Sequence, residues 1–320
     1  MKRKKARVLL NEAAGKKKGP KSILLFLERI ARHGYEPIIY PIIPGTGLTS
    51  EKILAEYEGK ADLVICIGGD GTLNHVVSSI MGMEERPVIG YIPSGSTNDF
   101  SRSLGIPATT LGALDVALNG NIISYDVGRI NDRYFNYTAA FGAFSEISYA
   151  TDQKLKNVMG YAAYVLNAAA NLHKNLSFKQ KVRIEGDGFR EEGEYVFGAV
   201  CNSVSIGGMN LLGNADVRLD DGKMELLLVR APHNIADLSA VVASLMRGDI
   251  NDPHIIFRQV SNVTFKSPTE LGWSIDGECG GKYKVSRIST EPKAISIKSG
   301  KKIRKRQPSA VKSAIKKTGR

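Results

Sequence analysis

A buried strand followed directly by a glycine-rich turn is the feature that most constrains the fold of this chain. The apolar run at residues 63–67 precedes the sequence Gly68-Gly69-Asp70-Gly71-Thr72. A continuous apolar run of this length is typical of a parallel strand that is covered on both faces. Glycine permits backbone dihedrals that other residues resist, and main-chain amides at a helix N-terminus attract phosphate. The pattern predicts a phosphate-binding turn with Asp70 where phosphate and metal would meet, the alternative being a tight βα turn without a ligand.

The first 120 residues alternate between strand and helix patterns. Strands are expected at 7–10, 38–43, 63–67 and 87–92, and helices at 20–33, 50–57, 74–81 and 109–118. This alternation predicts a doubly wound parallel sheet. Ligands of such sheets bind beyond the carboxyl ends of the strands, where both the glycine-rich turn and the polar loop at residues 93–99 are expected.

After residue 120 the pattern changes to short alternating runs, which predict an antiparallel sheet or sandwich. Strands are expected at 122–130, 134–141, 181–185, 195–203, 223–229, 262–267 and 282–288. Helices are expected at 149–173 and 235–246, and a hairpin should turn at 186–188. The chain is therefore expected to hold an α/β domain followed by a β-rich domain, with a cleft between them.

Positive charge is concentrated at the two ends of the chain. The net charge is +12, but residues 1–7 carry five basic side chains and residues 298–320 carry ten with no acid. Once these fifteen charges are set apart, residues 8–297 have a net charge of −3. Three interpretations of the tails remain open: solvated disorder, attraction to an anionic membrane and binding of nucleic acid. Base stacking is not indicated, because residues 298–320 contain no aromatic side chain.

The sequence shows no long uncharged apolar run and no signal-peptide pattern, so a cytoplasmic protein is expected. Cys66, Cys201 and Cys279 lie far apart without metal-binding spacing, which is typical of free thiols in a reducing compartment. Cys279 adjoins Glu278 and could be a nucleophile. No paired histidine is evident, so a small core or cleft residue is the preferred interpretation.

Four motifs carry the chemistry. They are Gly68-Gly69-Asp70-Gly71-Thr72-Leu73-Asn74, the loop from Ile92 to Arg102, Leu219-Asp220-Asp221-Gly222, and Ser274-Ile275-Asp276-Gly277-Glu278. In this order and spacing they resemble the diacylglycerol kinase catalytic-domain family, which includes bacterial soluble diacylglycerol kinases, related lipid kinases and sphingosine kinases. The resemblance covers residues 6–298, and its first and fourth motifs together are the most specific.

The resemblance implies an α/β N-terminal domain with a doubly wound parallel sheet, of the NAD kinase and diacylglycerol kinase kind, plus a β-sandwich C-terminal domain. The nucleotide-binding kinase domain would span residues 6–124 with a returning segment near 290–300. The lipid-substrate domain would span 125–289, and the basic tail at 301–320 would be disordered.

The resemblance also implies an ATP site. Its residues would be Asn11, Gly15, Thr46, Gly68, Gly69, Asp70, Gly71, Thr72, Leu73, Asn74, His75 and Ser96. The sequence departs from the family pattern at Glu12, which replaces a proline, and at Ser96, which replaces threonine but keeps a hydroxyl for a phosphate contact. It also departs at His75, which replaces the usual glutamate and alters the local charge.

Catalysis would rest on the fourth motif. Glu278 resembles the family's proton acceptor with Asp276 as its close partner, since a lipid hydroxyl is a poor nucleophile until a carboxylate takes its proton. Phosphoryl transfer otherwise depends on positioning and on charge neutralisation by Mg²⁺. Asp70 would belong to the catalytic Mg²⁺ network, and Asp126 matches another acid of that network. Taken alone, Asp276-Gly277-Glu278 could equally be a hairpin turn with exposed acids.

The third motif matches a second, structural Mg²⁺ site of some family members. Asp221 would supply a carboxylate, and the carbonyls of Arg218 and Lys223 would complete the protein ligands. A simple Asp-Asp-Gly turn is the alternative.

The sequence therefore predicts a cytoplasmic lipid kinase, peripheral at the inner membrane face, that uses ATP and Mg²⁺ to phosphorylate diacylglycerol. Its expected partners are a membrane lipid substrate at an anionic surface and a second copy in a homodimer, with no nucleic acid. Alternatives are an NAD kinase, which shares the glycine-rich loop, a non-catalytic nucleotide- or lipid-binding regulator, and a nucleic-acid binder acting through the tails. The acceptor stays open among diacylglycerol, monoacylglycerol, sphingoid bases, phosphatidylglycerol and undecaprenol-like alcohols.

Overall fold

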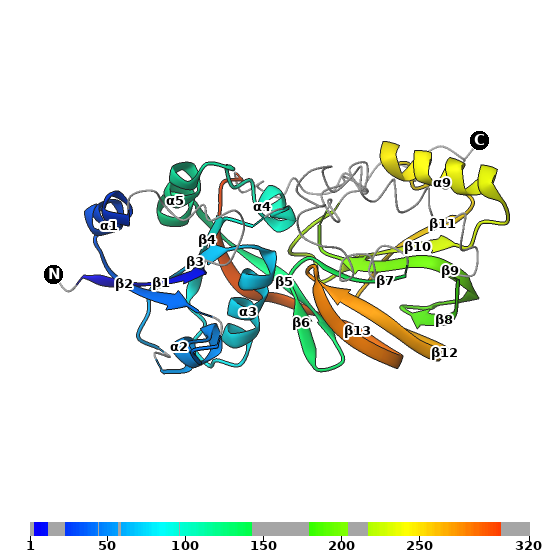
Figure 1. The fold of residues 1–320 in the computed structure, drawn as a ribbon, viewed down its shortest axis with the longest axis horizontal. Helices are drawn as coiled ribbons and strands as arrows, with labels where there is room; N and C mark the ends of the chain where they lie inside the picture. The colour runs from blue at the N-terminus through cyan, green and yellow to red at the C-terminus, as the bar shows by residue number, and fades with distance from the viewer. Residues whose placement is uncertain are drawn as a thin grey trace, which may run out of the picture.

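A computed structural model describes residues 3–11, 23–43, 45–56, 59–95, 97–142, 179–203 and 217–301. These residues form two halves that long strands connect (Figure 1). The helix expected at 149–173 and the expected site residues Gly15 and Ser96 lie outside the described residues. Among the helices of the described ranges, none has the length and apolar character needed to cross a membrane.

The first half is a parallel sheet with helices on both faces. Strands β1 (Lys4–Asn11), β2 (Tyr35–Ile42), β3 (Leu63–Gly68) and β4 (Val88–Pro93) lie in the order β4-β3-β1-β2. Helices α1 (Ile23–Arg32) and α5 (Thr110–Asn119) cover one face, and α2 (Ser50–Glu56) and α3 (Asp70–Met81) cover the other (Figure 1). The short α4 (Asp99–Ser103) follows β4. The predicted doubly wound sheet is confirmed.

The position of each strand in this sheet follows from its sequence. All six residues of β3 are buried, as its continuous apolar run predicts for a central strand. Among the described strands, β2 lies at the edge of the sheet and pairs with β1 alone. Its two prolines, Pro37 and Pro41, are tolerated there because an edge strand does not need every amide for a second ladder.

The second half is rich in antiparallel strands. They are β5 (Asn121–Ile130), β6 (Arg133–Phe135), β7 (Thr138–Gly142), β8 (Gln180–Gly186), β9 (Phe189–Cys201), β10 (Met224–Arg230), β11 (Ile255–Val260) and β12 (Asn262–Ile275). Helix α9 (Ile235–Arg247) packs on this half through Val241 and Leu245. The hairpin expected at residues 186–188 joins β8 and β9.

The two long strands β9 and β12 give this half its sandwich-like form. The early part of each strand pairs with β8 and the later part pairs with β7. The aromatic side chains of Phe141, Phe265 and Trp273 fill the space between the layers, with ring centroids 5.1–5.7 Å apart. The predicted β-sandwich is confirmed.

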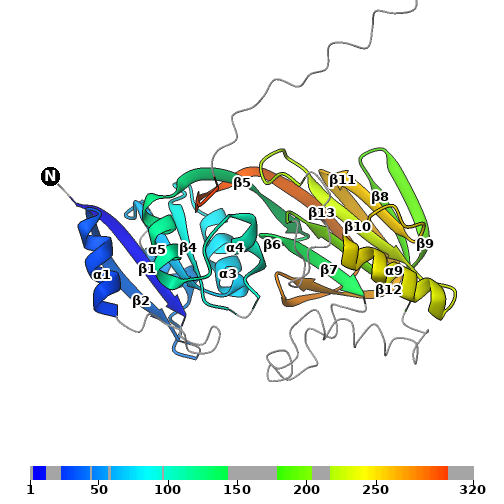
Figure 2. The ribbon, with the colours of Figure 1, turned by 90° about the horizontal axis from the view of Figure 1, so that it is seen from above.

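Strand β13 (Glu278–Ser299) connects the halves. It pairs first with β12, then with β5, and near its end Ile297 lies beside Ile89 of β4. Figure 2 shows β5 and β13 running together between the halves. The sequence predicted a strand at 282–288 and a separate returning segment near 290–300. They form one strand with an irregularity at 291–295, where Lys293 has a φ of 50°.

Two expected elements have different limits in the structure. Helix α3 begins at Asp70 rather than at residue 74, so the first motif is a strand end plus the first helical turn. The strand expected at 134–141 is divided into β6 and β7 by Asn136 and Tyr137. The amides of these two residues bind the side chain of Asp276 instead of a neighbouring strand.

Candidate active site

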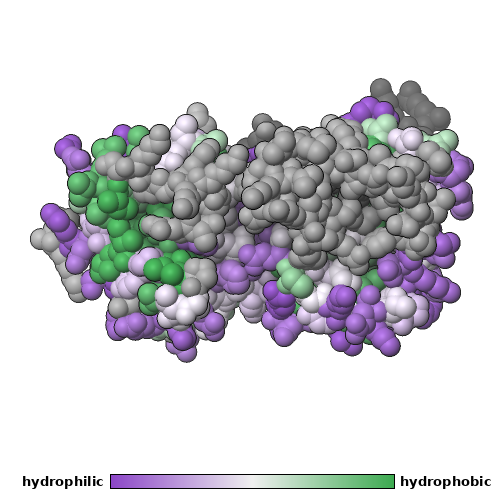
Figure 3. Space-filling model, in the orientation of Figure 1, coloured by the Kyte–Doolittle hydropathy of each residue, from purple (hydrophilic) through white to green (hydrophobic). Residues whose placement is uncertain are grey.

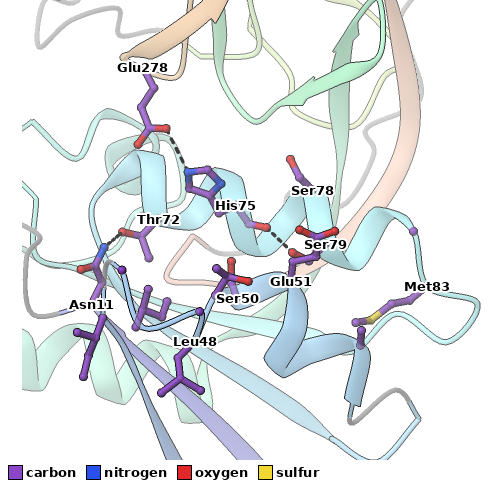
Figure 4. A pocket seen from close by; sticks show the side chains of 17 residues that line it. Asn11, Leu48, Ser50, Glu51, Thr72, His75, Ser78, Ser79, Met83 and Glu278 are labelled. Atoms are coloured by element: carbon purple, nitrogen blue, oxygen red, sulfur yellow. Dashed lines mark hydrogen bonds and ion pairs between the residues drawn. The ribbon is translucent and has the colours of Figure 1, made fainter.

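A pocket of about 820 Å³ runs along the outer face of α3, at the carboxyl ends of the parallel strands (Figure 4). Helix α3 lines it with residues spaced three or four apart, which is the spacing of one helix face. These are Thr72, His75, Ser78 and Ser79, followed by Gly82 just after the helix. The opposite wall comes from the loop after β2, from α2 and from Asn11, and one residue, Glu278, enters from the second half.

The two polar loops at this edge pack against each other at their glycines. The Ser94 amide donates to the Gly68 carbonyl at 2.8 Å, and a β-carbon on Gly95 would lie 2.7 Å from the α-carbon of Gly69. None of Gly68, Gly69 and Gly71 has a positive φ. The expectation that these glycines serve unusual dihedrals is therefore wrong, because what they allow is close approach of neighbouring atoms.

A side-chain hydrogen bond joins β1 to the first turn of α3. Asn11 Nδ2 donates to Thr72 Oγ1 at 2.8 Å, and both residues line the pocket. Thr46, which the family resemblance implies as an ATP-site residue, is not among the residues that line the pocket. Its hydroxyl donates to a carbonyl within its own exposed loop. Its neighbours Gly45 and Gly47 line the pocket in its place.

Glu278 lies over the N-terminus of α3. A β-carbon on Gly71 would overlap its carboxylate, so glycine at this position makes the room that Glu278 occupies. Nε2 of His75 lies 3.2 Å from Oε2 of Glu278. Their hydrogen bond lowers the pKa of Glu278 and raises the pKa of His75. Glu278 is therefore held as a carboxylate, the form that accepts a proton.

Asp276 and Gly277 form a two-residue turn between β12 and β13. Both have positive φ, 48° and 86°, a geometry that Asp-Gly sequences favour. The hairpin interpretation of this motif is thus right about the backbone, but Asp276 is only 2% exposed. Its carboxylate accepts four hydrogen bonds at 2.7–3.1 Å, from Nδ2 of Asn74 and from the amides of Asn136, Tyr137 and Thr138.

These contacts correct the role expected for Asp276. A carboxylate buried among four donors does not face an acceptor hydroxyl beside Glu278. It instead fixes the turn that carries Glu278 to α3 and to the β6–β7 connection. Burial outweighs the hydrogen bonds and raises the pKa of Asp276 to about 6.

Asp70 lies on the inner side of α3 and is not among the residues that line the pocket. It is 7% exposed and accepts the Asp99 amide at 3.0 Å, and the Tyr91 hydroxyl lies 3.5 Å away. Burial, followed by the charges of Asp99 and Asp276, raises the pKa of Asp70 to about 7. Three acids therefore share a buried region where the two halves meet.

Asp126 belongs to a different cluster. Its carboxylate accepts the amides of Gly222 and Lys293 at 2.6 and 2.7 Å. Burial raises its pKa, and the acids of the third motif raise it further. Asp126 thus contacts the third motif, and its expected membership in a Mg²⁺ network with Asp70 stays a prediction.

The third motif is a turn in which Gly222 has a φ of 78°. Asp221 Oδ1 accepts the Lys223 amide at 3.1 Å, and Arg218 lies 3.6 Å from Asp220. In the part of the chain that the structure describes, no three His, Cys, Asp or Glu side chains converge as metal ligands. The ligand roles of Asp221, Arg218 and Lys223 therefore stay predictions.

The structure brings some of the expected site residues together and separates others. Asn11, Thr72, His75 and Glu278 line one pocket, whereas Leu73 and Asn74 are buried inside with Asp70. Sequence reasoning missed the pocket residues Leu48, Ser50, Ser78, Ser79 and Met83. The helical spacing from Thr72 onward contained the signal for Ser78 and Ser79.

Two family matches together cover most of the chain. Residues 5–130 match the diacylglycerol kinase catalytic domain, and residues 139–299 match the YegS C-terminal NAD kinase beta sandwich-like domain. Among curated proteins, diacylglycerol kinases of Staphylococcus aureus strains bovine RF122 / ET3-1 and MRSA252 are 34% identical over 290 residues, which is 90% of each chain.

Solved structures share the fold. One from Bacillus anthracis strain Sterne has a TM-score of 0.75 at 22% identity and covers 93% of this chain and 96% of its own. A second, described as a diacylglycerol kinase from the same strain, has a TM-score of 0.69 at 20% identity and covers 93% and 98%.

The structure combines a parallel α/β domain, a β-sandwich domain and a pocket that Glu278 enters from the second half. This combination defines the two-domain class of lipid kinases. The chain belongs to the diacylglycerol kinase family. The expected enzyme class, an ATP-dependent kinase that phosphorylates an alcohol group, is confirmed at this level.

Proposed function

We propose that this protein transfers the γ-phosphate of ATP-Mg²⁺ to the hydroxyl of diacylglycerol, giving phosphatidic acid and ADP. The observation that carries the proposal is the ionised Glu278 carboxylate at the α3 end of a nucleotide-sized pocket. The names of the curated relatives support diacylglycerol as the acceptor.

The pocket suits a nucleotide in both size and lining. Its volume of about 820 Å³ lies within the usual range for small-molecule sites. Ile43, Leu48 and Met83 offer apolar contacts for the base. The N-terminus of α3 attracts phosphate through its free amides and its dipole. In the proposed pose, the base lies toward α2 and the γ-phosphate toward Glu278.

In the proposed reaction, Glu278 accepts the proton of the lipid hydroxyl. At the same time, the oxygen of that hydroxyl bonds to the γ-phosphorus. The bond between the γ-phosphorus and the bridging oxygen breaks at the same time, and ADP leaves. Asp276 does not react, because its oxygens are occupied by four donors. It keeps the Glu278 turn in place.

Mg²⁺ is part of the proposal in two places, as the ion bound with ATP and as a second, structural ion that the donors of the third motif fit. Mg²⁺ prefers carboxylate, carbonyl and water oxygens, and Asp221 with the carbonyls of Arg218 and Lys223 would supply oxygen ligands. The acidic side chains around Asp126 add to the negative charge there. When bound with ATP, Mg²⁺ neutralises charge on the phosphates.

We also place the enzyme at an anionic membrane surface on the cytoplasmic side. Figure 3 shows apolar surface gathered on the half that carries α1 and β2. Helix α1 contributes Leu24 and Leu25, which are 75% and 41% exposed. The basic side chains at the chain ends would add attraction of about 1 kcal/mol for each one near an anionic leaflet. A homodimer stays a prediction.

The test is transfer of labelled γ-phosphate from ATP-Mg²⁺ to a panel of lipid alcohols in mixed micelles, with NAD as a parallel acceptor. Glu278→Gln serves as the control variant. We expect labelled phosphatidic acid, and a rate about 10²–10⁴-fold lower in the variant with ATP binding retained.

Each other outcome contradicts part of the proposal. Label on another lipid alcohol would show that this alcohol, and not diacylglycerol, is the acceptor. Label on NAD would move the activity to the NAD kinases. ATP binding without any labelled product would favour a non-catalytic regulator, and an unchanged rate in Glu278→Gln would remove Glu278 as the base.

A further inference from the structure

The imidazole of His75 contacts the carboxylate of Glu278 in the pocket (Figure 4). His75 lies in the second turn of α3, and its Nε2 is 3.2 Å from Oε2 of Glu278. The His75 side chain is 62% exposed and that of Glu278 is 48% exposed. The pair therefore connects the proposed reaction centre to solvent.

The backbone that carries Glu278 is fixed on both sides. Before it, Asp276 is held by four hydrogen bonds. After it, Arg133 Nη1 of β6 donates to the Cys279 carbonyl at 2.8 Å. With the backbone fixed, the position of the Glu278 carboxylate depends on its own side-chain torsions, and the contact with His75 restricts these.

The charged groups around His75 come from three elements. Glu278 of β13 forms the ion pair, Arg133 of β6 acts against protonation of the imidazole, and Glu51 of α2 lines the same pocket. The hydrogen bond to Glu278 has the largest effect and raises the pKa of His75 above its ordinary value of 6.5. A proton that arrives at this pair therefore resides on the imidazole rather than on the carboxylate.

We propose that His75 is a positioning residue whose Nε2–H donates to Oε2 of Glu278 and so aims the carboxylate at the acceptor hydroxyl. This inference rests on the proposed function. The O–H bond of the lipid alcohol breaks, its oxygen bonds to the γ-phosphorus, and ADP leaves. The proton passes from the alcohol to the Glu278 carboxylate, whose contact with His75 through Oε2 leaves Oε1 to accept it. The half-exposed carboxyl group then releases the proton to water.

The contact between His75 and Glu278 predicts a specific pH dependence. Because an imidazolium lowers the pKa of Glu278 and so weakens it as a base, kcat rises as pH increases through the raised pKa of His75, above 6.5. Without the imidazole, the acidic limb of the profile is set by the Glu278 carboxyl, whose ordinary pKa is 4.5. Removal of His75 therefore shifts the limb to lower pH, a change that a purely structural role would not produce.

The experiment compares kcat from pH 5 to pH 9 for the full-length protein and for His75→Gln, His75→Ala and the matched control His233→Gln. His233 is an exposed histidine just before α9, in the second half. ATP binding is measured for each protein by calorimetry, and folding by thermal melting. His75→Ala is also assayed with added imidazole.

We expect His75→Ala to bind ATP normally and to lose about tenfold or more in kcat at pH 8. His75→Gln keeps a donor but no charge, so it should lose less activity and shift its acidic limb below that of the unchanged protein. Imidazole should restore part of the activity of His75→Ala and none of that of Glu278→Gln. The control His233→Gln should keep the profile of the unchanged protein.

Two results would overturn the inference while leaving the proposed function intact. One is an acidic limb in His75→Gln identical to that of the unchanged protein. The other is a lower kcat with an unshifted limb and no rescue by imidazole, which would assign His75 a structural role. Absence of lipid phosphorylation by the unchanged protein would instead reject the proposed function itself.

Discussion

The carboxylate of Glu278 occupies the space that a side chain on Gly71 would fill. The two residues lie 207 positions apart in the chain, and β13 brings the turn that holds Glu278 onto the first turn of α3. Gly71 of the first motif thus leaves the space that Glu278 of the fourth motif occupies.

Gly71→Ala should separate activity from stability. A methyl group at residue 71 would displace the Glu278 carboxylate, which is the end of a flexible side chain and can move at little cost in folding free energy. We expect kcat to fall about tenfold or more with a melting temperature within a few degrees of the unchanged protein. The control is Gly272→Ala in β12, where the nearest atom of the described residues to a β-carbon is Lys282 Cγ at 4.0 Å. Full activity in Gly71→Ala would show that the position of Glu278 is not critical.

Asp276→Asn should destabilise the junction of the two halves. An amide keeps one acceptor oxygen, but its NH₂ group would face backbone amides that now donate to the carboxylate. Buried donors left without acceptors cost about 1–3 kcal/mol each, so the free energy of unfolding should fall on the order of 3 kcal/mol. Urea unfolding at pH 7 measures this change. An unaffected unfolding curve would contradict the anchoring role of Asp276.

Asp70→Asn should stabilise the protein above neutral pH, whereas Asp276→Asn should destabilise it. The pKa of Asp70 is raised from 3.8 to about 7 in the folded protein, so between these values the folded state binds more protons than the unfolded state. By linkage, stability is then lost as pH rises through about 7. Asparagine can keep the Asp99 amide contact and carries no charge. The repulsion with Asp99 and Asp276 is thereby removed.

The measurement is the melting temperature of Asp70→Asn and of the unchanged protein from pH 5 to pH 8.5, with a chelator present. We expect the variant to melt higher at pH 8.5 and its melting temperature to depend less on pH in this range. A parallel pH dependence of both proteins would mean that Asp70 does not titrate as its burial implies.

Deletion of residues 302–320 should weaken binding to anionic vesicles at low salt, because the deletion removes most of the basic charge of the C-terminal tail. Catalysis in detergent micelles should not change. Co-sedimentation with vesicles of phosphatidylglycerol, beside neutral vesicles as the control, measures the effect. Equal sedimentation of both proteins at low salt would contradict membrane attraction by the tail.

Much of the first sheet could be predicted from sequence, because its signals are local. The apolar run of β3 and the strand–helix alternation each depend on residues close in the chain. The Asp276-Gly277 turn was likewise evident as a turn. The start of α3 was placed too late, since glycines in the first motif suggested a loop, whereas their role is to admit neighbouring atoms.

The roles of the four acidic candidates could not be predicted from the residues next to them in the sequence. The sequence identified Asp70, Asp126, Asp276 and Glu278 as candidates, yet it assigned all four to one reaction centre. Burial separates them: Glu278 is half-exposed in the pocket, Asp70 and Asp276 share the buried junction, and Asp126 binds two amides beside the third motif.

The sequence by itself determined the family, the doubly wound sheet and the residues that carry chemistry, because motif order and hydrophobic period are properties of neighbouring residues. The tertiary structure alone decided which carboxylate lies half-exposed in the pocket and which is buried as a structural anchor. That decision depends on contacts such as Asn74 with Asp276, 202 residues apart, since the charge state and the exposure of an acid follow from the groups packed around it rather than from its neighbours in sequence.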